Sequence, residues 1–137
     1  MDINQYELIC KLRMKDSLLL YDYTRVNGNH TQNVEYSVRT NPDNPIFKGH
    51  FPGRPVLPGV MILRLFTLCA SDVCGKDLMM QRTVQSKFLN FVDPQVHSEL
   101  TVHLSISEDE EGYNVGAELK NSTTSFTEAS LRLMPAP

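Results

Sequence analysis

The sequence predicts an α+β fold, in which an antiparallel sheet of five or six strands curls around one buried helix. Two observations carry this prediction. Several segments alternate apolar and polar residues, as half-buried strands do, and one central segment is apolar nearly all round, as a buried helix is. A helix of that kind needs a covering layer, and a curved sheet supplies it. With 137 residues, the chain is expected to form one domain, residues 1–137.

The N-terminal part predicts a short helix followed by two strands. Residues 3–13 place apolar side chains on one side of a helix, and Asp2 is a candidate N-cap. Ser17 to Val26 reads as a strand that ends at a turn-like Asn-Gly-Asn sequence. Asn33 to Thr40 alternates apolar and polar residues and is expected to pair antiparallel with it.

A stiff loop and the central helix come next. Residues 41–57 are rich in proline and glycine. Proline fixes the backbone angle φ, and glycine allows conformations that other residues do not adopt, so the loop is expected to be stiff and irregular. Pro58 suits the first position of a helix, and the segment Val60 to Cys74 is expected to be helical, with Gly75 as its C-cap. Its few polar residues form a narrow stripe: Arg64, Thr67, Ser71 and Asp72.

The remaining chain predicts strands only. Four strand regions are expected: Met79–Val92, Leu100–Ser107, Tyr113–Leu119 and Ser125–Leu133. The breaks between them are Asp93-Pro94, an acidic turn and an Asn-Ser turn, in that order. The second and third should form a hairpin around the acidic turn, residues 108–112.

Composition and charge narrow the classes of function. The net charge is −3 and basic residues do not cluster, so nucleic acid is not an expected partner. No apolar run reaches the roughly 18 residues of a membrane span, and the N-terminus lacks the pattern of a signal peptide. Three cysteines in apolar surroundings predict neither a disulfide framework nor a zinc site. We therefore expect a reduced, cytoplasmic protein.

The most informative segment is GHFPGRPVLPGV, from Gly49 to Val60. It resembles the signature of the 3-hydroxyacyl-[acyl carrier protein] dehydratases of type II fatty acid synthesis. The similarity extends to LLLYDYTRV, residues 18–26, and to SKFLNFVDP, residues 86–94, which resemble the first strand of that family and its post-helix strand with the following loop. The resemblance therefore covers most of the chain in the right order.

The resemblance implies a fold, an assembly and a substrate class. The family has a hotdog fold, a curled antiparallel sheet around a central helix, and it dimerises so that two sheets join. Its active site lies at the dimer interface and faces a tunnel for the acyl chain. The expected partners are an acyl thioester, carried by acyl carrier protein or coenzyme A, and a second hotdog chain in a homodimer or heterodimer. We expect no cofactor and no metal.

The resemblance also implies a role for individual residues, according to their position in the motif. Dehydration needs a base that removes the C2 proton, a donor for the enolate oxygen and an acid for the leaving hydroxyl. His50 matches the family's base, and imidazole exchanges its proton near neutral pH. The backbone N–H of Gly59 matches the oxyanion donor, at a helix start where amides lack internal partners. Phe51, Val60 and Arg64 are the expected substrate-binding residues.

The acid position departs from the family's pattern. The family has Glu or Asp fourteen residues after the histidine, whereas this chain has Arg64, and Leu68 replaces a frequent glutamine. A guanidinium stays protonated at neutral pH and cannot deliver a proton. Arg64 could bind an anionic part of the substrate, pair with an acidic residue, or replace the acid electrostatically while another group supplies the proton.

The predicted function is a 3-hydroxyacyl dehydratase-like activity on acyl thioesters, in fatty acid or polyketide-type lipid synthesis, with two alternatives. One is a weakened, substrate-binding or partner subunit of a hotdog heterodimer, and the other is a hotdog thioesterase. Other residues are weaker candidates. His30, His97 and His103 read as surface or sheet residues, and the acidic run 108–111 reads as a solvated hairpin tip. We expect Ser71 and Asp72 to face a cavity or interface, and Cys69 to be no nucleophile.

Overall fold

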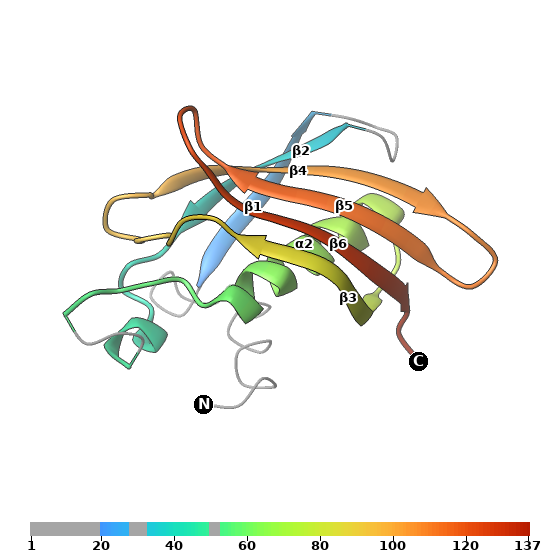
Figure 1. The fold of residues 1–137 in the computed structure, drawn as a ribbon, viewed down its shortest axis with the longest axis horizontal. Coiled ribbons are helices and arrows are strands. Elements are labelled where there is room, and N and C mark those ends of the chain that lie inside the picture. Colours follow the sequence, from blue (N-terminus) through green and yellow to red (C-terminus); the bar gives the residue numbers. More distant parts are fainter. Residues whose placement is uncertain (1–19, 28–32, 50–52) are drawn as a thin grey trace.

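A single curled antiparallel sheet encloses one long helix (Figure 1). The computed structural model describes residues 20–27, 33–49 and 53–137. The sheet has six strands in the order β1-β2-β4-β5-β6-β3. The elements are β1 Tyr21–Asn27, β2 Val34–Thr40, the 3₁₀ helix η2 Pro45–Lys48, α2 Gly59–Cys74, β3 Leu78–Phe88, β4 Glu99–Glu108, β5 Tyr113–Lys120 and β6 Ser125–Pro135.

The position of α2 in the chain explains the strand order. The chain leaves β2 near one edge of the sheet, passes through α2, and returns as β3 at the opposite edge, beside β6. The helix therefore crosses the concave side of the sheet (Figure 1). This is the architecture that the family resemblance implies, a sheet wrapped around a central helix.

The core forms between α2 and the inward faces of the strands. Leu65 and Phe66, in the middle of the helix, are completely buried. They belong to the same core cluster as alternate residues of the central strands, such as Val102 and Leu104 of β4. Burying each large apolar side chain contributes about 1.5–3 kcal/mol, so a helix that is apolar nearly all round is stable only inside this sheet.

The C-terminal end of α2 is closed by bonds within the chain. Gly75 adopts a left-handed conformation, with φ of 65°, and its N–H donates to the carbonyl of Ser71. Asp72 accepts hydrogen bonds from Arg25 (3.0 Å) and from the hydroxyl of Tyr36 (2.5 Å). Burial, and then the bond to Asp72, raise the pKa of Tyr36. Strands β1 and β2 are thus tied to the helix.

The structure confirms the predicted order of elements with three differences. The helix begins at Gly59, so that Pro58 is its N-cap rather than its first residue. The loop of residues 41–57 contains a short 3₁₀ helix, η2. The strand expected over Met79–Val92 ends at Phe88, because the N–H groups of Leu89 and Asn90 both donate to the carbonyl of Phe126.

Two further predictions concern other parts of the chain. The hairpin around residues 109–112 forms as expected between β4 and β5. The helix predicted over residues 3–13 lies outside the described residues, as does the start of the strand predicted from Ser17. Among the described residues, no helix is long and apolar enough to cross a membrane.

Candidate functional site

Among the residues that the structure describes, no side chain caps the N-terminus of α2. Pro58 occupies the N-cap position and makes no side-chain cap. Its carbonyl accepts the N–H groups of Met61 and Ile62, at 3.0 and 3.1 Å. The amide of Gly59 belongs to the first turn of the helix. The N–H groups of a first turn have no carbonyl acceptor within the helix, and the helix dipole favours negative charge at this end. This end can therefore donate a hydrogen bond to an oxyanion.

The same helix end borders an apolar pocket of about 320 Å³. The segment before the helix is held in place by the N–H of Leu57, which donates to the carbonyl of Val92 at 2.9 Å. This bond joins the helix entry to the loop after β3. The pocket is lined by Val56, Leu57, Gly59, Ile62, Phe88, Asn90, Phe91 and Val92. Its volume and lining suit the apolar part of a small ligand.

Phe88 packs directly against Gly59. A Cβ atom placed on Gly59 would lie 2.9 Å from both Cε1 and Cζ of the Phe88 ring, which is closer than carbon atoms in contact normally approach. Any side chain at position 59 would therefore displace the tip of this ring, and the backbone conformation at Gly59 is not of the kind that favours glycine. The ring is half exposed and forms one wall of the space beside the helix end.

Val60 and Arg64 follow on the first two turns of α2. Four residues separate them, so they lie on the same face of the helix. Val60 is 47% exposed and Arg64 is partly buried. Neither residue lines the apolar pocket. Leu68, one turn further along, is buried. This face thus carries a cation where the resemblance expects an acid.

The structure brings only some of the predicted site residues together. Gly59 lies at the pocket, and Val60 and Arg64 lie on the adjoining turns of the helix. His50 and Phe51 lie outside the described residues, so their roles stay predictions. The described residues on either side, Gly49 and Gly53, are exposed.

Two polar residues of the predicted helix stripe have internal roles. The hydroxyl of Ser71 donates to the carbonyl of Thr67 at 2.8 Å and accepts the N–H of Leu78 at 3.1 Å. Asp72 bonds to β1 and β2, as described above. Both residues connect the helix to strands of the same chain, where the sequence had predicted a cavity or an interface.

Cys69 and His97, two of the remaining candidates, are held inside the fold. Cys69 is fully buried, and burial raises the pKa of its thiol well above the usual value, as expected for an inert cysteine. His97 accepts the N–H of Asp93 at Nδ1 and packs edge-on against Phe126. His103 lies on the outward face of β4, while His30 lies outside the described residues.

The acidic run is a hairpin tip with one strong ion pair. Asp109 accepts the N–H groups of Glu111 and Gly112, and its carboxylate binds Arg132 through two contacts of 2.7 Å. Arg132, and then the N–H of Glu111, lower the pKa of Asp109 to about 2. Over the described ranges, no cluster of His, Cys, Asp or Glu is arranged to hold a metal ion.

Sequence reasoning missed the aromatic wall of the pocket. Phe88 and Phe91 lie in the segment that was expected to be strand, and their contribution depends on how the chain turns after Phe88. The only signal in the sequence was a pair of aromatic residues, Phe88 and Phe91, three positions apart shortly before Asp93-Pro94.

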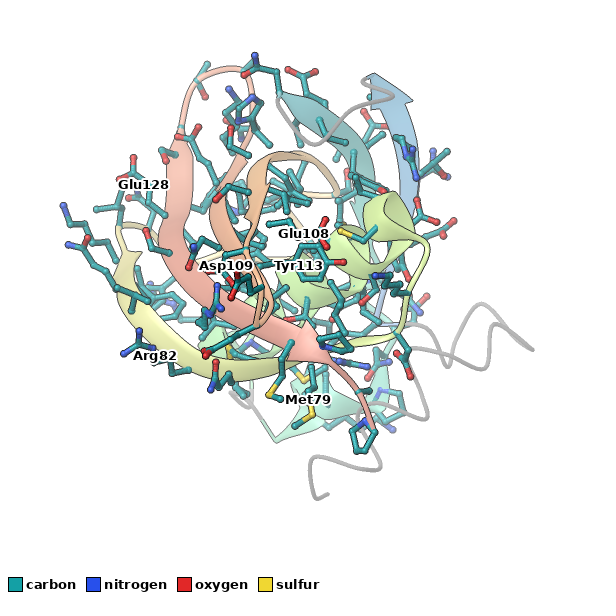
Figure 2. The ribbon with its side chains drawn as sticks, turned by 90° about the vertical axis from the view of Figure 1, so that its right-hand side faces the viewer. Met79, Arg82, Glu108, Asp109, Tyr113 and Glu128 are labelled. Atoms are coloured by element: carbon teal, nitrogen blue, oxygen red, sulfur yellow. The ribbon has the colours of Figure 1, made fainter. Side chains whose placement is uncertain are left out.

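Strand β3 forms an exposed edge of the sheet. Only Leu78 of its eleven residues is buried. Apolar side chains project from it or follow it: Met79, Met80, Val84, Phe88, Leu89 and Phe91. Figure 2 shows Arg82 of β3 and Glu128 of β6 on the outer side of the sheet, away from α2. Long apolar edge strands of this kind are typical places for pairing with a second chain.

Comparisons with known proteins agree with this geometry. The family model described as ApeI dehydratase matches residues 26–127. A curated relative, 3-hydroxyacyl-[acyl-carrier-protein] dehydratase FabZ of Caulobacter vibrioides, is 29% identical over 92 residues, which are 67% of this chain and 57% of the relative. The chain thus spans little more than half the length of that relative.

Solved structures share the fold at low identity. One is "The Dehydratase Heterocomplex ApeI:P from Xenorhabdus doucetiae", with a TM-score of 0.64 and 16% identity, covering 82% of this chain and 98% of that chain. Another is a hypothetical thioesterase with coenzyme A from Streptococcus pneumoniae, with a TM-score of 0.63 and 9% identity, covering 84% and 86%. The chain has the hotdog fold, and it belongs to the ApeI-like family of dehydratases.

Proposed function

We propose that this chain takes part in the dehydration of 3-hydroxyacyl thioesters in fatty acid or related lipid synthesis. The observation that carries the proposal is the N-terminus of α2, which no described side chain caps and where Gly59 opens onto an apolar pocket. A helix end supplies a donor for the thioester oxygen, and the pocket receives the apolar chain next to it. The family match and the FabZ relative support the same reaction.

The proposed reaction assigns a role to each group. His50 takes a proton from C2, and the electrons move toward the thioester oxygen, whose negative charge faces the amide of Gly59. The C3–O bond then breaks, and the hydroxyl leaves as water after gaining one proton. The products are a 2-enoyl thioester and water. A preorganised donor such as Gly59 typically contributes about 10²–10³ in rate.

The source of the proton for the leaving hydroxyl is the main question. Arg64 occupies the position of the family's acid, and a guanidinium cannot supply a proton at neutral pH. Loss of general-acid assistance costs about 10²–10⁴ in rate. A second candidate function is therefore a partner subunit, in which an acid-bearing hotdog chain completes the site. The similar solved structure titled a dehydratase heterocomplex favours this candidate.

The proposed assembly is a dimer formed through β3. Its long apolar edge leaves backbone groups available for pairing with a second strand, and burial of Val84 and Phe88 would stabilise the pair. The partner is either a second copy or a related hotdog chain. The proposed substrate carrier is acyl carrier protein or coenzyme A.

The deciding experiment measures enoyl product and free thiol separately. The purified chain is incubated with 3-hydroxyacyl thioesters of acyl carrier protein and of coenzyme A, and enoyl formation is followed by mass spectrometry. Dehydration at an ordinary rate by the chain alone supports the enzyme and rejects the weakened subunit. Thiol release without enoyl product would instead identify a thioesterase.

The variant Arg64→Glu tests the acid step. Restoring a carboxyl group at this position is expected to raise the dehydration rate by about 10²-fold or more if only the acid is missing. Arg64→Gln is the matched control, because it removes the charge without supplying a proton donor. Equal rates for both variants would show that the site differs from the family's site in more than this residue.

A further inference from the structure

The edge strand β3 carries two charged residues, and both are positive. Its sequence, LMMQRTVQSKF, contains Arg82 and Lys87 but no Asp or Glu. All of its residues except Leu78 are exposed, and within the described part of the chain no salt bridge involves either cation. Strand β1, at the opposite edge of the sheet, carries one charge of each sign, Asp22 and Arg25. The unbalanced charge therefore lies on the edge that is proposed to pair.

Both cations lie on the outer face of the sheet. Arg82 lies opposite Arg132 of β6 in the strand register, and Lys87 lies opposite Glu128. Arg132 and Glu128 are four residues apart on one strand and so share a face. The spacing of five residues on β3 still matches this face, because the register shifts at Val84. Figure 2 shows Arg82 and Glu128 on the outer side. Glu128 offsets part of the charge at Lys87, whereas Arg82 has another cation beside it.

Pairing of β3 with a copy of itself would bring these cations together. An antiparallel strand added at the edge extends the sheet, so its outer side chains lie beside those of β3. A two-fold axis midway between Arg82 and Lys87 places Arg82 of each copy opposite Lys87 of the other. A shift by two residues makes them diagonal neighbours, about 7–8 Å apart, which is still within the screening length of about 8 Å in physiological salt. Like charges in such positions destabilise a strand pair.

We propose that β3 pairs preferentially with a non-identical chain whose edge strand presents carboxylates opposite Arg82 and Lys87. This inference rests on the assembly through β3 proposed above, and it favours the related chain over the second copy. Charges on an edge strand often prevent pairing altogether. On β3 they stand among exposed apolar side chains, including Met80, Val84 and Phe88, which favour contact. Repulsion of the wrong partner and attraction of the right one then act together to give specificity.

A charge-reversed form of this chain serves as the acidic partner in the main experiment. The double variant Arg82→Glu/Lys87→Glu is mixed with the wild type, and sedimentation velocity gives the Kd of each pair. The mixed dimer should form with a Kd at least about 5-fold below that of the wild-type homodimer, because two repulsive contacts become attractive. Raising NaCl from about 0.05 to about 0.3 M should weaken the mixed dimer and strengthen the homodimer. Equal Kd values, or no association in the mixture, would overturn the inference.

The matched control makes the same change in net charge away from β3. Arg39→Glu/Lys48→Glu alters exposed residues of β2 and of the 3₁₀ helix η2. This variant should gain no affinity for the wild type. An equal gain would show that net charge, and not the position of the charges on β3, drives the association, and it would also overturn the inference.

A third variant separates this inference from the proposed assembly. Val84 has no register partner on β6, and proline is tolerated at such an irregularity but cannot donate a hydrogen bond to an added strand. Val84→Pro, with its fold checked by circular dichroism, should abolish the mixed dimer. A mixed dimer that survives would overturn both the assembly through β3 and the inference. A homodimer that is lost in Val84→Pro but insensitive to charge reversal would overturn the inference alone. Association is measured without substrate, so the outcome does not depend on dehydration activity.

Discussion

The two ends of α2 differ in how their polar groups are satisfied. At the C-terminal end, Gly75 caps the helix and Asp72 binds Arg25 and Tyr36, so that the helix is tied to β1 and β2. At the N-terminal end, Pro58 provides no side-chain cap, and Gly59 borders an apolar pocket. The chain therefore satisfies the polar groups at the C-terminal end of the helix, whereas no described side chain caps the N-terminal end.

One end of α2 thus contributes mainly to the stability of the fold, and the other end is the one proposed for function. Hydrogen bonds at the closed end stabilise the fold directly, whereas amides left without a cap forgo about 1 kcal/mol of stability that a capping side chain would supply. Functional sites commonly carry such local costs. Substitutions at the closed end should therefore change stability and those at the N-terminal end should change activity.

The largest expected effect is at the middle of the helix, which supports both ends. Phe66 is completely buried in the core, so Phe66→Ala should lower the free energy of unfolding by about 3–5 kcal/mol. Urea denaturation measures this change. Retention of full stability would mean that the sheet does not depend on the helix for its core.

The next effect is at the closed end. Tyr36→Phe removes the hydroxyl that donates to Asp72 and accepts from Arg25. A hydrogen bond to a charged group contributes about 1.5–3 kcal/mol, and a loss of this order is expected in thermal or urea denaturation. Activity on acyl thioesters should be unchanged at temperatures where the variant is folded. A selective loss of activity would contradict the separation of the two ends.

A pH effect is expected at the hairpin tip. Arg132 holds the pKa of Asp109 at about 2, below its ordinary value of 3.8. The ion pair therefore contributes stability above about pH 4, and that contribution is lost as the pH falls toward 2. Asp109→Asn keeps an oxygen for the N–H groups of Glu111 and Gly112 but removes the charge. Denaturation midpoints of the two proteins should converge between pH 4 and pH 2, and a constant gap would contradict the assignment.

The smallest effect on stability is expected at the N-terminal end. Phe91 is 70% exposed and lines the pocket. Phe91→Ala should change the free energy of unfolding by no more than about 0.5 kcal/mol, as most exposed substitutions do, while it raises the KM for acyl thioesters. The exposed Val26→Ala on β1 is the control for both measurements. A change in stability without a change in KM would contradict the assignment of activity to the N-terminal end of α2.

Local patterns predicted most elements correctly. The helix, its Gly75 cap and the β4–β5 hairpin all depend on neighbouring residues, whose periodicity and turn chemistry are visible in the sequence. The strand after the helix was predicted too long, because the sequence offers no clear break before Asp93-Pro94. Its true end at Phe88 depends on hydrogen bonds to Phe126, which lies far along the chain.

The candidate site was predicted only in part for the same reason. The motif indicated Gly59 at a helix start and the substitution of the acid by Arg64, since both follow from position in the sequence. The partners of Asp72 and the contact between Phe88 and Gly59 join segments that are far apart in the chain. Neither contact leaves a pattern in a single sequence.

The sequence by itself determined the order of the elements, the buried character of α2 and the motif that places an amide donor at its start. These properties depend on residues within one or two turns of each other. Only the tertiary structure decided which strands Asp72 joins to the helix, which aromatic ring borders Gly59, and that β3 lies at an exposed edge. Those outcomes depend on how the sheet curls, because the curl brings β3, β6 and the two ends of α2 into contact or keeps them apart.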